Sequence, residues 1–169
     1  SASTLGEDVI VLNSFSKYWM MTGWRLGWLL APESLIPAID RLAQNVFLSA
    51  PTVSQYAALA ALEPSTRLIL EARKRVLGER RNWLLPELKH LGFAVDANPQ
   101  GAFYIYADVS PFSMEGEVLA DKLLLEAGVA ITPGTDFGSH KASRHVRLAY
   151  TTSLERIQEA VGRMERVLG

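Results

Sequence analysis

Two continuous apolar runs near the N-terminus, residues 9–12 and 26–31, limit the possible folds of this chain more than any other segment. A run without polar alternation is typical of a strand that is buried on both faces, as in a parallel sheet covered by helices. Two strands alone do not form a stable sheet. We therefore expect residues 1–63 to be the remnant of a larger α/β domain.

The rest of the chain alternates between helical and strand patterns. Apolar residues at helical spacing predict helices at 33–47, 52–62, 65–90, 115–127 and 153–169. Aromatic and β-branched runs predict strands at 93–95, 102–109, 129–132 and 145–151. The expected fold class is α/β, and residues 64–169 are expected to hold a long bridging helix and a small α/β domain.

Composition removes several classes of function. The chain has 17 Lys and Arg against 18 Asp and Glu, so its charge gives no reason to expect nucleic acid or an anionic membrane as a partner. It has no Cys and only 3 scattered His, so we expect no metal site. No run reaches the roughly 18 apolar residues of a spanning helix, and the first residues lack a signal-peptide core, which favours a cytoplasmic protein. The first residue is Ser rather than Met, which indicates a piece of a longer chain.

The residues best suited to chemistry lie between Ser14 and Gly27. Lys17 directly follows a predicted strand, and ligands of α/β sheets bind at the carboxyl ends of strands. Its neighbours are aromatic, and an amine among apolar groups loses its charge more readily, as a Schiff-base lysine requires. Arg25 with the hydroxyls of Ser14 and Ser16 has the donors for a phosphate. On spacing alone, a surface lysine and a salt-bridged arginine are the better-supported reading.

This stretch resembles the lysine signature of the class I/II aminotransferases, which are pyridoxal-phosphate enzymes of the aspartate aminotransferase family and fold type I. The matching segments are SFSK at 14–17 and MTGWRLGW at 21–28. The resemblance continues at 101–104, 133–138 and 146–148. Met20 departs from the pattern, since the family usually has a small residue there.

The resemblance implies a role for each matching residue. Lys17 would form the Schiff base with pyridoxal 5'-phosphate and would move the proton between the substrate Cα and the cofactor. Arg25 and Ser14 would bind the cofactor phosphate, and Ser16 is a weaker candidate because its hydroxyl also suits a turn. Arg147 would hold the substrate α-carboxylate as a bidentate pair.

Two questions remain open at these positions. Arg144 is an alternative to Arg147, although Val146 and Leu148 put Arg147 on the opposite face of its strand. Tyr104, like its neighbour Phe103, fits either the border of a substrate pocket or core packing. Trp24 and Trp28 alternate with Arg25 and Gly27, and we expect both to be core residues.

The resemblance further implies that the chain is the C-terminal portion of an aminotransferase, with the end of the large-domain sheet followed by the small domain. The whole enzyme would move an amino group between an amino acid and a 2-oxo acid, in amino acid metabolism or biosynthesis, as a homodimer. The family's remaining cofactor contacts precede the lysine, so we expect this fragment alone to be inactive. The alternatives are the aminotransferase-like effector domain of a transcription regulator and a fold type I lyase.

Overall fold

The computed structural model describes residues 4, 6, 8–96 and 98–169. The chain divides into two compact units, Ser1–Lys74 and Arg75–Gly169, and each unit is described by itself. The division falls within the longest helix, α3 (Pro64–His90), whose predicted span of 65–90 is confirmed. The boundary predicted at 63/64 concerns the domains of a larger fold and stays a prediction.

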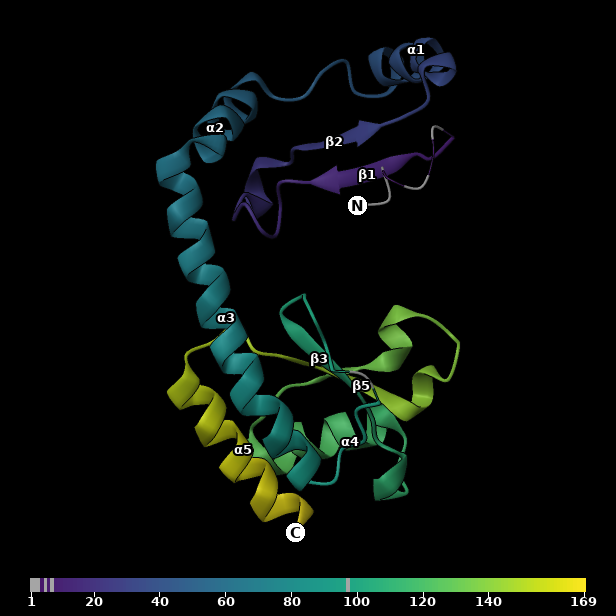
Figure 1. The fold of residues 1–169 in the computed structure, drawn as a ribbon. Coiled ribbons are helices and arrows are strands. Elements are labelled where there is room, and N and C mark those ends of the chain that lie inside the picture. The colour runs from purple at the N-terminus through teal and green to yellow at the C-terminus, as the bar shows by residue number, and fades with distance from the viewer. Residues whose placement is uncertain (1–3, 5, 7, 97) are drawn as a thin grey trace. The chain divides into compact units, whose positions relative to one another are not determined.

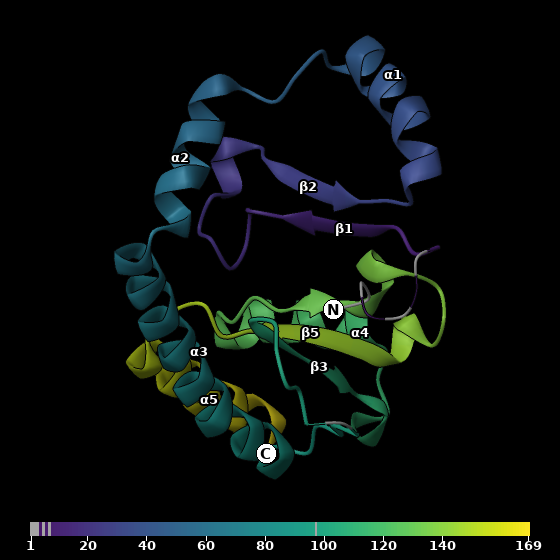
Figure 2. The ribbon, with the colours of Figure 1, turned by 45° about the horizontal axis from the view of Figure 1, so that its top comes forward.

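The first unit contains a two-stranded sheet and three helical segments. Strands β1 (Val11–Ser14) and β2 (Gly27–Leu30) run side by side in Figures 1 and 2. They are followed by a 3-10 turn (Glu33–Leu35), by α1 (Ile36–Val46) and by α2 (Thr52–Leu62). The N-terminal part of α3 completes the unit, and all three helices begin and end close to the predicted residues.

The parallel direction predicted for these strands is wrong for the pair that they form with each other. The two strands pair antiparallel, with Ser14 opposite Gly27 and Val11 opposite Leu30. An apolar run indicates burial but carries no information about strand direction, and here the chain reverses through the turn between the strands. The strands are also largely exposed, with Leu12 at 76%, because the described residues of this unit are too few to cover both faces of the sheet.

The core of the first unit is small. Phe15 and Met21, from the turn after β1, pack with Ala58 and Ala61 of α2. The buried Ser54 hydroxyl of α2 donates a hydrogen bond of 2.6 Å to the carbonyl of Trp24 and so fixes the helix against the turn. The core positions expected for Trp24 and Trp28 are wrong for this chain, because both side chains are exposed.

The second unit is built on a three-stranded antiparallel sheet in the order β3-β5-β4. Its strands are β3 (Tyr104–Asp108), β5 (His145–Ala149) and the short β4 (Thr132–Pro133). The strand predicted at 93–95 is reduced to a single bridge between Ala94 and Asp108. Its helices are the C-terminal part of α3, α4 (Gly116–Lys122) with a π-helical turn (Leu123–Ala127), and α5 (Leu154–Leu168).

One face of this sheet is covered and the other is open. Val146, Leu148 and Tyr150 are buried together, as their alternation predicts. They pack with Ile105 of β3 and with apolar residues of α3, α4 and α5, and Figures 1 and 2 show α5 alongside the lower part of α3. The residues between them on β5 lie on the opposite face, and Arg147 is one of these.

Two kinds of feature were not found among the described residues. Within the described residues, no helix is both long and apolar enough to cross a membrane. In the same part of the chain, no three His, Asp or Glu side chains are grouped in a way that could hold a metal ion.

Candidate active site

The turn between β1 and β2 brings the N-terminal candidate residues to one end of the small sheet. Ser14 ends β1, and the next residue, Phe15, donates its backbone N–H to the carbonyl of Leu26 at 3.1 Å. The chain then turns through Lys17, whose carbonyl accepts a 3.1 Å hydrogen bond from the N–H of Met20. Arg25 lies just before the start of β2, so Ser14, Lys17 and Arg25 all lie at this end.

Hydrogen bonds within the turn orient the phosphate-binding candidates. The Ser14 hydroxyl accepts a 3.0 Å hydrogen bond from the backbone N–H of Ser16, so its own O–H points elsewhere. The Thr22 hydroxyl donates to the carbonyl of Ser16 at 2.7 Å, and Arg25 Nη1 donates to the carbonyl of Thr22 at 2.9 Å. Arg25 has φ of 52°, a left-handed conformation that is uncommon outside glycine. Ser16 thus supports Ser14 through its backbone.

Lys17 is exposed in this chain, and the apolar surroundings expected from its neighbours are only partly formed. The ring of Phe15 is buried and packs on Trp19 with centroids 5.6 Å apart. The Tyr18 ring also packs on Trp19, and its hydroxyl donates a 2.5 Å hydrogen bond to Glu71 of α3, which raises the pKa of Tyr18. The residues beside Lys17 therefore anchor the turn on both sides.

Arg147 lies on the open face of the sheet in the second unit. Directly opposite it are Tyr106 on β3 and Thr132 on β4. Its guanidinium carbon lies 5.4 Å from the ring centroid of Tyr104 and 4.4 Å from that of Phe137. Arg147 forms no ion pair with any described residue, and its half-buried charge therefore suits an anionic ligand.

Arg144, the alternative to Arg147, is already used by a local network. Its Nη2 lies 3.1 Å from Asp108 Oδ2, and its Nε donates to the Ser110 hydroxyl at 2.6 Å. Asp108 also accepts a 2.7 Å hydrogen bond from the N–H of Ser110. Burial raises the pKa of Asp108, but the hydrogen bonds from Ser110 and the charge of Arg144 outweigh it and hold the pKa below its ordinary value. This arrangement favours Arg147 as the ligand-binding arginine.

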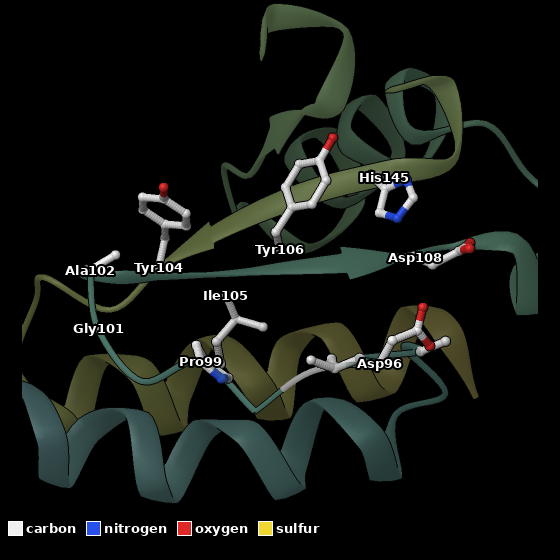
Figure 3. Close-up of a pocket in the computed structure, with 11 residues that line it drawn as sticks. Asp96, Pro99, Gly101, Ala102, Tyr104, Ile105, Tyr106, Asp108 and His145 are labelled. Atoms are coloured by element: carbon white, nitrogen blue, oxygen red, sulfur yellow. The ribbon is translucent and has the colours of Figure 1, made fainter. Parts of the chain in front are cut away.

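A hollow of about 350 Å³ lies beside β3 in the same unit. Figure 3 shows Tyr104, Tyr106 and His145 on one side of the strand pair, with Ile105 and Asp96 on the other. The rings of Tyr106 and His145 stack with an interplanar angle of 4° and centroids 4.8 Å apart. Tyr104 and Tyr106 thus have one side toward this hollow, and Tyr104 also contacts Arg147.

Sequence reasoning did not identify Phe137 as a site residue. The segment 133–138 forms a 3-10 turn (Gly134–Phe137) in the structure. The contact between Phe137 and Arg147 joins two residues 10 apart across a loop, and no local periodicity reports such a contact. The signal available in the sequence was an aromatic residue between two glycines, inside a segment of the family resemblance.

Comparisons with known proteins agree with these features. Residues 3–164 match the family described as aminotransferase class I and II. A (5-formylfuran-3-yl)methyl phosphate transaminase of Methanocaldococcus jannaschii is 41% identical over 96% of the chain, and a valine–pyruvate aminotransferase of Mycobacterium tuberculosis is 40% identical over 94%. A crystal structure of an aminotransferase from Mycobacterium tuberculosis superposes with a TM-score of 0.93 at 39% identity, covering 99% of this chain and 43% of that one.

The chain therefore belongs to the class I and II aminotransferase family, and its mixed α/β fold is that of fold type I aminotransferases. It spans 42% of the length of the first of these relatives and 41% of the second. The C-terminal placement expected from the lysine motif stays a prediction.

Proposed function

We propose that the chain is the lysine-bearing part of a pyridoxal-phosphate-dependent aminotransferase that moves an amino group between an amino acid and a 2-oxo acid. The observation that carries this proposal is the grouping of Lys17, Ser14 and Arg25 at one end of the β1–β2 pair. The aminotransferase names of relatives about 40% identical support it.

The residues at this end fit the proposed cofactor, pyridoxal 5'-phosphate. An amine is needed to hold the cofactor's aldehyde carbon covalently, and Lys17 supplies one. A phosphate needs charged and neutral donors, which Arg25 and the oriented hydroxyl of Ser14 supply. We assign Ser16 a supporting role, since its N–H binds the Ser14 oxygen.

Each residue then has a defined task in amino transfer. When bound, the cofactor supplies an electron sink for the charge left on the substrate Cα after its proton is removed. Once the substrate's amino group has replaced it on the aldehyde carbon, the freed Lys17 amine would take that proton from Cα and would deliver it to C4′ of the bound cofactor. Arg25 and Ser14 bind the phosphate, so the cofactor keeps its position while Lys17 moves the proton.

Arg147 is proposed to bind the substrate α-carboxylate. Its guanidinium offers two parallel N–H donors, which match the two carboxylate oxygens. The ion pair between Arg144 and Asp108, and the lack of one at Arg147 among the described residues, support this choice. A fixed carboxylate orients the Cα–H bond for removal of the proton.

The finer features of the whole protein remain proposals. We propose that residues 1–63 are the end of the large domain and that residues 64–169 hold the bridging helix and the small C-terminal domain. A homodimer is supported by the apolar surface of the first unit, since patches of this kind mark interaction sites. Exposed examples are Leu12, Leu42, Phe47, Leu48 and Leu59. The cytoplasmic location is proposed from the sequence alone.

The transcription regulator and the lyase are not favoured, because the relatives carry aminotransferase names.

The test of the proposal uses the full-length protein that carries this sequence. Lys17→Ala should remove the visible absorption band of the bound cofactor and lower amino transfer by at least about 10³-fold, since a covalent catalyst is lost. Lys89→Ala, at an exposed lysine of α3, is the matched control. Parental turnover in Lys17→Ala would refute the assignment.

A further inference from the structure

We propose that Phe137 and Tyr104 form an aromatic clamp that fixes the guanidinium of Arg147 and thereby sets the affinity for the substrate α-carboxylate. The inference rests on the proposed role of Arg147 and assigns two further positioning residues to the same reaction. Tyr104 comes from strand β3, and Phe137 comes from the 3-10 turn (Gly134–Phe137) that follows β4.

The distances place both rings within range of the charge. The guanidinium carbon of Arg147 lies 4.4 Å from the centroid of Phe137 and 5.4 Å from that of Tyr104. A cation within about 6 Å of a ring centroid is attracted by the negative face of the ring. Phe137 is 49% exposed, so its ring is not part of the core, and its ring contact is with Arg147.

Polar contacts within the described residues leave the guanidinium weakly restrained. Its Nη2 reaches the Thr132 hydroxyl at only 3.5 Å, the outer limit of a hydrogen bond. Its Nε is buried and has no hydrogen-bond partner in the part of the chain that the structure describes. The bidentate fork of an arginine binds a carboxylate only when its plane is correctly oriented. The ring contacts are therefore the main restraint on that plane.

The turn that carries Phe137 is itself held tightly. A Cβ on Gly134 would lie 2.4 Å from the carbonyl oxygen of Ala142 and 2.8 Å from that of His145, so only glycine fits there. The next residue, Thr135, donates a 2.6 Å hydrogen bond from its hydroxyl to Glu117 on α4. Phe137 thus extends from a turn that is fixed at its start, which is what a positioning residue requires.

The test substitutes Phe137 in the full-length enzyme and measures steady-state kinetics with an amino acid and with its 2-oxo acid. Phe137→Leu keeps an apolar side chain but removes the ring face. It should raise KM for both substrates about 5- to 20-fold, as the loss of one partly desolvated cation–π contact implies. The value of kcat and the cofactor affinity should change by less than about 2-fold. Phe137→Tyr keeps an aromatic ring at this position and should leave KM close to the parental value.

A double-mutant cycle separates the clamp from a general structural effect. Arg147→Lys keeps the charge but lacks the planar guanidinium, so Phe137→Leu should have little further effect on KM in that background. An undiminished effect there, or an unchanged KM in the single variant Phe137→Leu, would overturn the clamp. If Arg147→Lys leaves KM at the parental value, the proposed carboxylate role of Arg147 fails, and the clamp is refuted with it. A raised KM in Arg147→Lys but not in Phe137→Leu refutes only the clamp.

Discussion

The two units bury their apolar residues to very different extents. Among the described residues, fifteen buried side chains form one cluster in Arg75–Gly169, whereas four do so in Ser1–Lys74. Helix α1 of the first unit has no buried residue, although its apolar residues lie at helical spacing. The second unit thus supplies its own core, and the first exposes surfaces that its sequence would allow to be buried.

Because of this difference, Arg147 and Lys17 have different amounts of structural support. Arg147 extends from a sheet whose other face is packed, so its backbone is held by a real core. Lys17 lies on a turn whose support is the small cluster around Phe15 and the hydrogen bond of Tyr18 to Glu71. We infer that the surroundings of Arg147 are preformed within its own unit, whereas those of Lys17 depend more on the surfaces that cover them.

Two leucine-to-alanine substitutions in α3 give the strongest test of this difference between the units. Leu88 lies in the second unit and is fully buried, whereas Leu68 lies in the first and is 74% exposed. Leu88→Ala should lower the free energy of unfolding by about 2–5 kcal/mol through lost burial and a cavity. Leu68→Ala should change it by less than about 0.5 kcal/mol. Urea unfolding of the 169-residue chain measures both, and equal losses would contradict the comparison.

Substitutions of Arg147 and Arg25 test whether the two units have the different functions proposed for them. In the full-length protein, Arg147→Ala should lower kcat/KM roughly 10²-fold by removing charge-assisted contacts, with little change in cofactor affinity. Arg25→Ala should do the opposite and weaken cofactor binding first. Cofactor titration and steady-state kinetics on both variants give the crossed pattern. An equal loss of cofactor in both would assign Arg147 a structural role.

Two glycines of the second unit test how closely that unit is packed. Gly134→Ala should lower the free energy of unfolding by about 1–3 kcal/mol, since the new Cβ would meet the Ala142 carbonyl oxygen at 2.4 Å. Gly162→Ala lies within α5 with no atom within 4 Å of the new Cβ. It should raise the same quantity by about 0.5–1 kcal/mol through helix propensity. A neutral Gly134→Ala would show that the turn is looser than described.

The smallest expected effect concerns acid stability. The pKa of Asp108 is lowered in the folded state, so its contribution is present above the ordinary value of 3.8 and is lost as the pH falls through the lowered value. Arg144 is 54% exposed, and solvent limits the pair to below about 1 kcal/mol. Asp108→Asn should therefore show a smaller drop in Tm between neutral pH and pH of about 3 than the parent. An identical drop in both proteins would argue against the pair.

Much of the second unit could be predicted because its patterns report local burial. Val146, Leu148 and Tyr150 share the packed face as expected, and α5 begins close to the predicted residue 153, where the Ser153 hydroxyl accepts the N–H of Arg156 at 3.5 Å. These features depend on the alternation of apolar and polar residues along a strand and on the residue that precedes a helix. Both depend on residues that are close together in the sequence.

The failures in the first unit have a different origin. The apolar run at β1 predicted a buried parallel strand, yet its direction and cover depend on which segments lie beside it. Trp24 and Trp28 are large apolar residues of a kind that is often buried, but the core that the described residues form is too small to bury them. The hydrophobicity of a segment shows that it can be buried, and the segments that pack beside it determine whether it is buried.

The central claim is that Lys17 holds the cofactor. The direct measurement is reduction of the cofactor-loaded, full-length protein with borohydride, which makes the bond between cofactor and lysine permanent, followed by digestion and mass spectrometry. The account predicts the added pyridoxyl mass on the peptide that contains Lys17 and on no other lysine, and its loss in Lys17→Ala. A label on a different lysine, or a loaded protein without any labelled lysine, would contradict the claim.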